Sequence, residues 1–229
     1  MSVASAGPAR PEPGADGSPV PVRLSVAELV ERARRMAVPG QRALLGVTGP
    51  PGAGKTTLAS AVVRALGPDL AVLVPMDGFH LADPTLVAWG RRERKGAPDT
   101  FDVGGYVALL RRLRDQHEDV VHAPEFDRAL EASLGSAVPV AREVPLVVTE
   151  GNYLLSTEGA WAEVAPLLDE SWYLQLPDDV RVGRLVRRRE GYGSDHDEAV
   201  AWALGSDQAN ADVVARGRSR ADLLVSLVG

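Results

Sequence analysis

The sequence contains no cysteine, which excludes disulfide bonds, iron–sulfur ligation and thiol catalysis by this chain. It also has no apolar run that approaches the roughly 20 residues of a membrane-spanning helix, so we expect no membrane partner. The first residues, Met1–Pro8, lack the charged and apolar regions of a secretory signal. These absences fit a reducing compartment, and we expect a cytoplasmic protein.

An excess of positive charge is absent as well. The 25 Lys and Arg residues are outnumbered by 31 Asp and Glu residues, which gives a formal net charge of −6. A general nucleic-acid binder needs a basic surface that releases counterions, so we expect no nucleic-acid partner.

The composition is that of a globular protein with a disordered extension. Hydrophobic residues make up 45% of the 229 residues, which is enough for a sizeable core. Residues 1–22 are rich in Pro, Gly, Ala and Ser, and this bias predicts a disordered tail. We expect a single domain over residues 23–229.

One stretch fits the phosphate-loop pattern G-x-x-x-x-G-K-[ST] without a mismatch. Its residues are Gly49, Pro50, Pro51, Gly52, Ala53, Gly54, Lys55 and Thr56, followed by Thr57. An apolar run precedes the loop, and a helical pattern that stops at Gly67 follows it. A strand, a glycine-rich turn and a helix N-terminus together favour anion binding, because backbone N–H groups and the helix dipole point at the anion. We predict that these residues bind a nucleoside triphosphate, with Lys55 at the β and γ phosphates and Thr56 on Mg²⁺.

Apolar runs alternate with helical patterns along the rest of the chain. This alternation predicts an α/β fold with a mostly parallel sheet covered by helices on both faces. We expect further strands at residues 71–74, 120–122, 145–149, 172–176 and 221–226. We expect helices at residues 25–36, 57–66, 105–117, 179–190 and 195–204, an irregular connection at 81–104, and a hairpin or loop at 129–140.

Two acidic residues directly follow predicted strands. Asp77 follows the strand at 71–74, and Glu150 follows the strand at 145–149. Ligands collect at the carboxyl ends of parallel strands. Phosphoryl transfer needs a carboxylate that orients the attacking hydroxyl and accepts its proton, and Asp77 is placed to supply it. Glu150 would hold Mg²⁺, directly or through water. The alternatives are a turn-forming aspartate and a solvated glutamate.

Four further motifs carry a resemblance to a known family. They are Met76–His80, Lys95–Asp102, Pro124–Arg128 and Glu150–Leu155. In this order they resemble the superfamily of phosphoribulokinase, uridine kinase and bacterial pantothenate kinase, and most of all its branch labelled fructose-transport kinases. The resemblance spans roughly residues 40–227.

The resemblance implies a P-loop NTPase fold, a three-layer α/β/α sandwich with a helical lid, and the use of ATP and Mg²⁺. It also implies that Asp77 is the catalytic base, that Lys55 and Thr56 hold the triphosphate and metal, and that Glu150 is the second metal-side carboxylate.

In the family that the chain resembles, a mobile lid carries arginines over the phosphates. We place this lid at about residues 178–205, where Arg184, Arg187 and Arg188 occupy the matching helix. We select Arg187 and Arg188 as candidate catalytic residues, with a solvated basic face as the alternative.

Candidate substrate contacts follow the predicted strands. They are Phe79, His80, Asp102, Phe126, Arg128 and Tyr153. For the aromatic residues, packing is the alternative to ligand contact. The residues Phe126–Arg128 match the position of substrate-contacting residues in the related kinases but not their identities, so the sequence does not name the acceptor.

A phosphate loop alone does not choose among kinases, GTPases and ATPases. The guanine-reading N-K-x-D sequence is absent, and Glu150 lacks the preceding aspartate common in mechanical ATPases. We predict an ATP- and Mg²⁺-dependent kinase that phosphorylates a hydroxyl of a small-molecule substrate: a nucleoside, a sugar or a pantothenate-like compound. The alternative is a nucleotide-dependent regulator or metallochaperone, because the loop also resembles that of GTPases that service cobalamin enzymes. Dimers occur in the related kinases, so a homodimer stays open.

Overall fold

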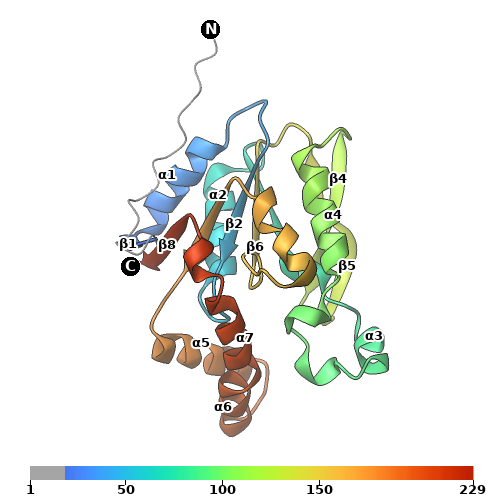
Figure 1. Cartoon of the computed structure of the whole chain (residues 1–229), viewed down its shortest axis with the longest axis vertical. Helices are drawn as coiled ribbons and strands as arrows, with labels where there is room; N and C mark the ends of the chain where they lie inside the picture. The colour runs from blue at the N-terminus through green and yellow to red at the C-terminus, as the bar shows by residue number, and fades with distance from the viewer. Residues whose placement is uncertain (1–18, 229) are drawn as a thin grey trace.

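The computed structural model describes residues 19–228 and contains one six-stranded parallel sheet (Figure 1). The strand order is β1, β8, β7, β2, β6, β3. The strands are β1 (Pro21–Leu24), β2 (Ala43–Thr48), β3 (Ala71–Pro75), β6 (Leu146–Gly151), β7 (Glu170–Leu174) and β8 (Leu223–Leu227). The predicted α/β class with a mostly parallel sheet is confirmed.

Helices cover both faces of this sheet. In β6, Leu146 and Val148 pack in the apolar layer of α1 (Val26–Met36) and α2 (Lys55–Leu66). The residue between them, Val147, packs in the opposite layer with α4 (Val103–Arg114). Successive side chains of a strand point to opposite faces. A strand buried on both faces is therefore apolar throughout, which is the pattern that the sequence displays.

The amino-terminal boundary differs from the prediction. Pro21 and Val22, which we assigned to the tail, belong to β1, and β1 pairs in parallel with β8 at the sheet edge. A four-residue edge strand that begins with proline carries too little pattern to be recognised from sequence. The rest of the predicted tail, residues 1–18, lies outside the described residues. The helix α1 begins as predicted after Ser25, whose side chain forms a capping box with Glu28.

The segment that the sequence left as hairpin or loop is a hairpin. It pairs β4 (Val120–Asp127) with β5 (Ala132–Ala141) in antiparallel register. Val121 and Val140 are cross-strand partners and are fully buried in the layer that contains α4. The connection predicted as irregular contains α3 (Asp83–Ala88) and short 3₁₀ turns. The 3₁₀ turns within residues 19–228 are η1 (Met76–Phe79), η2 (Arg92–Arg94), η3 (Pro98–Thr100), η4 (Gly159–Glu163), η5 (Ala165–Leu167) and η6 (Arg218–Arg220).

Three consecutive helices follow β7: α5 (Asp178–Glu190), α6 (His196–Leu204) and α7 (Ser206–Ala215). They lie at the same end of the sheet as α3 (Figure 1). The first two match the prediction, but α7 was not predicted, since it follows Gly205 and no described residue caps it through a side chain. Within residues 19–228, no helix combines the length and apolar character that crossing a membrane requires.

A buried ion pair fastens α1 to the sheet. Arg32 of α1 donates from Nε to Oε1 of Glu170 in β7, and the two side chains are only 11% and 9% exposed. The indole Nε1 of Trp172 donates to the same carboxylate oxygen. The pair lies against the apolar layer of α1 and α2, where both of its charges have little access to water.

We expect Glu170→Gln to lower the free energy of unfolding by about 3–5 kcal/mol, because it removes the carboxylate from a buried ion pair. Urea denaturation measures this change. Glu163→Gln is the matched control, since Glu163 pairs with Arg111 at the surface, where the side chains are 49% and 56% exposed. The control should lose at most about 1 kcal/mol. Equal losses in the two variants would contradict the assigned role of the buried pair.

Candidate active site

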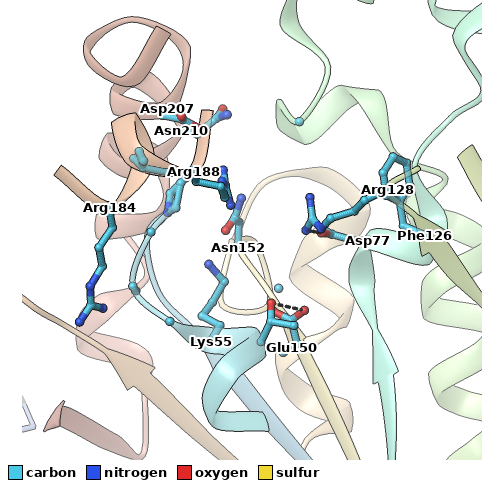
Figure 2. A pocket seen from close by; sticks show the side chains of 18 of the residues that line it. Lys55, Asp77, Phe126, Arg128, Glu150, Asn152, Arg184, Arg188, Asp207 and Asn210 are labelled. Carbon is cyan, nitrogen blue, oxygen red and sulfur yellow. Dashed lines mark hydrogen bonds and ion pairs between the residues drawn. The ribbon is translucent and has the colours of Figure 1, made fainter. Parts of the chain in front are cut away.

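A cavity of about 890 Å³ opens at the carboxyl ends of the strands. Because β2, β6 and β3 are neighbours, the phosphate loop after β2, Glu150 in β6 and Asp77 after β3 come from adjacent strands. Figure 2 shows Lys55 and Glu150 between two walls, with Asp77 and Arg128 on one side and α5 and α7 on the other. The sheet thus brings the predicted chemical groups into one cavity.

The phosphate loop turns sharply into α2. Gly52 and Gly54 have φ values of 83° and 92°, in the left-handed region that glycine adopts at least cost. Among the described residues, no side chain caps the N-terminus of α2, so its first backbone N–H groups face the cavity without such a partner. Lys55 is 8% exposed, its Nζ donates to the carbonyl oxygen of Pro50 at 3.1 Å, and burial lowers its pKa. These features fit a site for a polyanion.

Glu150 is almost completely buried beside the start of α2. The hydroxyl of Thr56 donates to its Oε1 at 3.1 Å. Burial, and then the nearby charge of Asp77, raise the pKa of Glu150 to about 7. A bound cation would offset this cost of ionisation, and a hydroxyl beside a carboxylate is the donor chemistry that Mg²⁺ accepts. The residues therefore fit the metal that the sequence predicted.

Asp77 lies on η1, directly after β3. Its Oδ2 accepts a hydrogen bond from Nη2 of Arg128 at 3.3 Å, and its Oδ1 is 3.9 Å from Nε2 of His80. The His80 ring stacks on Phe101 with ring centroids 4.1 Å apart. Burial lowers the pKa of His80 to about 4, so its imidazole is neutral near pH 7. Asp77 therefore faces one cation and one neutral ring.

The opposite wall comes from α5 and α7. Arg184 and Arg188 of α5 line the cavity with Asp207 and Asn210 of α7, and Figure 2 shows Arg188 beside these two residues. Burial raises the pKa of Asp207, and the charge of Arg188 opposes this shift. Asp207 and Asn210 were missed because α7 was not predicted. Their three-residue spacing, with apolar Ala211 and Val214 following, is the signal that could have found them.

Most residues predicted for the site line the cavity. They are Pro51, Gly52, Ala53, Gly54, Lys55, Thr56, Thr57, Asp77, His80, Phe126, Arg128, Glu150 and Arg188. The structure adds Arg92, Lys95 and Asn152, which the sequence gave no specific reason to select.

Three of the predicted substrate contacts do not line the cavity. Phe79 packs against Tyr106, with ring centroids 5.1 Å apart. Asp102, which we placed in the irregular connection, caps α4 by accepting a hydrogen bond from the backbone N of Gly105 at 2.9 Å. Tyr153 is buried and donates to the carbonyl oxygen of Gly96 at 2.6 Å.

Two residues of the phosphate loop and one arginine also do not line the cavity. Gly49 packs against β7, because a Cβ at this position would lie 2.5 Å from the carbonyl oxygen of Leu174. Pro50 lines a separate hollow of about 160 Å³ and serves the loop through its carbonyl oxygen. Arg187 is exposed and does not line the cavity. Arg184, Arg188 and Arg189 of the same helix do line it.

The comparisons with known proteins agree with this geometry. The chain is 33% identical over 193 residues to the uncharacterized protein YggC of Escherichia coli, with 82% of this chain and 79% of YggC covered. It is 28% identical over 211 residues to a candidate uridine kinase of Schizosaccharomyces pombe, with 88% of this chain and 90% of that protein covered. A solved structure, a candidate fructose transport system kinase from Silicibacter sp. TM1040, superposes with a TM-score of 0.77 at 38% identity, covering 88% of this chain and 98% of that one. No protein-family model matches the chain.

The raised pKa of Glu150 predicts a pH dependence of stability in the protein without metal or nucleotide. The unfolded chain releases this proton near the ordinary pKa of 4.5, whereas the folded protein holds it up to about pH 7. This contribution to stability is therefore complete below pH 4.5 and is lost as the pH rises through 7. Between pH 5 and 8, we expect the free energy of unfolding of the natural protein to fall by on the order of 2–3 kcal/mol more than that of Glu150→Gln.

Urea denaturation at several pH values measures this difference. Glu163→Gln, which removes an exposed carboxylate, should keep the slope of the natural protein. Parallel pH curves for the natural protein and Glu150→Gln would contradict the assignment.

Proposed function

Because the chain belongs to the P-loop kinases of the uridine kinase family, we propose that it transfers the γ-phosphoryl group of ATP to a hydroxyl group of a small metabolite. The observation that carries the proposal is the shared cavity of Asp77 and the phosphate loop. A nucleotide switch needs the loop but has no need of a carboxylate facing it across an open space. A kinase needs both.

Asp77 acts as the general base. The acceptor hydroxyl donates a hydrogen bond to the Asp77 carboxylate, which orients its oxygen toward the γ-phosphorus. As the new O–P bond forms, the bond between the γ-phosphorus and the bridging oxygen breaks, ADP leaves, and the hydroxyl proton passes to Asp77. His80, whose Nε2 is 3.9 Å from Oδ1 of Asp77, is neutral near pH 7.

The loop and α5 hold the triphosphate. The backbone N–H groups at the start of α2 bind phosphate oxygens, and Lys55 turns from the Pro50 carbonyl to the β and γ phosphates. Arg184 and Arg188 share the face of α5 that lines the cavity. Their guanidinium groups stabilise the charge that spreads over the transferring phosphoryl group.

The Thr56 hydroxyl and the Glu150 carboxylate would hold Mg²⁺. A bound Mg²⁺ neutralises phosphate charge during transfer. The names of the relatives point to different acceptors, uridine in one case and a fructose transport system in another. They therefore support a hydroxyl acceptor in general and leave its chemical class to the cavity itself.

We expect Asp77→Asn to lower kcat by roughly 10²–10⁴-fold, because the amide cannot accept the proton. The measurement is ADP release from Mg·ATP with a panel of nucleosides, sugars and vitamins, beside direct titration of ATP, whose affinity should be unchanged. The control is Asp169→Asn. Asp169 is 35% exposed and pairs with Arg114, much as Asp77 is 31% exposed and pairs with Arg128, but it lies outside the cavity. Tight ATP binding, no stimulation by any acceptor and no effect of Asp77→Asn would instead favour a nucleotide-dependent regulator.

The two neighbouring arginines of α5 provide a second test. We expect Arg188→Gln to lower kcat by roughly 10²–10³-fold, because it removes a donor to the transition-state charge. Arg187→Gln removes an equally exposed charge from the adjacent position and should change kcat little. The same kinetic assay measures both variants. A larger loss in Arg187→Gln would mean that α5 presents its other face to the phosphates during turnover.

A further inference from the structure

The acceptor end of the cavity holds one cation whose charge is only loosely engaged. The Arg128 side chain is 50% exposed, and among the described residues its guanidinium makes a single hydrogen bond, to Oδ2 of Asp77 at 3.3 Å. A strong pair between a guanidinium and a carboxylate is shorter, about 2.7–2.9 Å, and often has two parallel bonds. Most of the five N–H donors of Arg128 are therefore open to a ligand.

The turn that carries Arg128 is fastened on both sides. Oδ1 of Asp127 accepts hydrogen bonds from the backbone N of Ala129 at 2.8 Å and of Leu130 at 3.0 Å. Nζ of Lys95 donates to the carbonyl oxygen of Glu131 at 2.9 Å. Glu131 adopts a φ of 51°, a left-handed conformation that a non-glycine residue keeps only where its surroundings hold it. The hairpin thus presents Arg128 to the cavity from a fixed backbone.

The other groups nearby do not offer a comparable positive charge. Lys95 lies 5.1 Å from the ring centroid of Phe126, but its side chain is 10% exposed and its Nζ donates to Asp83 at 2.7 Å. His80 is neutral near pH 7. Arg92 also donates to Asp83, at 2.7 Å. Among the residues that the structure describes in this part of the cavity, Arg128 therefore has the most weakly engaged charge, since Arg92 and Lys95 have short bonds to Asp83.

The proposed proton transfer to Asp77 changes the hydrogen bonding of Arg128. When the Asp77 carboxylate turns to an acceptor hydroxyl and takes its proton, Arg128 loses its hydrogen-bond partner. A neutral acceptor supplies no replacement for this partner, whereas an acceptor with its own anionic group binds the guanidinium with two parallel hydrogen bonds.

We propose that the acceptor is a small hydroxy acid or phosphate ester and that Arg128 binds its carboxylate or phosphate group. Because Asp77 and Arg128 are in direct contact, the phosphorylated hydroxyl lies within a few bonds of that anionic group. This inference rests on the proposed kinase function and gives the chemical class of its acceptor.

The test compares matched acceptors that differ only in the anionic group. The pairs are glycerate with glyceramide, glycerol 3-phosphate with glycerol, and pantothenate with its alcohol analogue, beside uridine and fructose. For the natural protein, we expect a carboxylate or phosphate acceptor to exceed its neutral counterpart in kcat/KM, and the two kinds of pair distinguish the two anions. Arg128→Gln should lower kcat/KM for the anionic acceptor by roughly 10- to 150-fold, mainly through KM. Its effect on kcat/KM for the neutral counterpart should be smaller than for the anionic acceptor, and Arg128→Lys should restore part of the difference.

The hairpin offers a matched control at its other end. Arg142 is also 50% exposed and has its Nη2 3.3 Å from Asp119, as Arg128 has its Nη2 3.3 Å from Asp77, but Arg142 does not line the cavity. Arg142→Gln should leave the selectivity among acceptors unchanged. A similar loss in this variant would overturn the assignment of Arg128.

Two further outcomes separate this inference from the kinase function. If neutral acceptors react as well as anionic ones, and Arg128→Gln lowers kcat for all of them alike, Arg128 only holds Asp77 and the kinase function stands.

A readout independent of turnover is the NMR signal of the Arg128 Nε–H group with Mg·ADP bound, assigned by its loss in Arg128→Lys. We expect this signal to shift with glycerate or glycerol 3-phosphate and not with glycerol. No shift with any anion of the panel would overturn the inference even if no acceptor is turned over.

Discussion

The site depends on the adjacency of three parallel strands. The strand β6 lies between β2 and β3 and is paired with both along its length, so Glu150 stands between the phosphate loop and Asp77. The strands on either side of β6 end in elements of different chemistry. The loop after β2 binds anions through its backbone, and the turn after β3 supplies the Asp77 carboxylate. Because the spacing of neighbouring strands is fixed by their hydrogen bonds, the distance between the anion site and the carboxylate is a property of the sheet. Loops and helices then add selectivity without having to create this spacing.

The charged residues of the cavity also form two groups, which are buried residues near the central strands and more exposed residues on the surrounding elements. Lys55 and Glu150 are both buried, and burial shifts the pKa of each toward its neutral form. A polyanion with a bound cation supplies the opposite charge to each of these two residues, so its binding stabilises their ionised forms. Arg184, Arg188 and Arg128 reach the cavity from helices and a hairpin outside the central strands, and they remain more exposed. Their side chains can therefore move with a bound ligand.

The sequence predicted those parts of the fold and site that depend on short-range pattern. The phosphate loop follows β2, Asp77 lies just after β3 and Glu150 lies near the end of β6, so knowing each strand was enough to place the residue at the correct edge. Asp102 and Tyr153 also lie where the pattern indicated, but the direction of a side chain depends on packing. Asp102 turns back to cap α4, and Tyr153 reaches Gly96 in a distant loop. The choice between Arg187 and Arg188 required the rotation of α5, which an arginine-rich segment does not reveal because most of its face is polar.

The β4–β5 hairpin is the part of the site whose position the six-stranded sheet does not determine. It lies outside the six-stranded sheet, is antiparallel, and contributes Phe126 and Arg128 to the cavity. Its turn is held by Asp127 and Lys95, neither of which contacts the phosphate loop through a hydrogen bond within the described residues. A change in this turn can therefore alter the groups that meet the acceptor and leave the phosphoryl-transfer groups in place. For this reason the acceptor must be inferred from Arg128 and its neighbours and not from the fold.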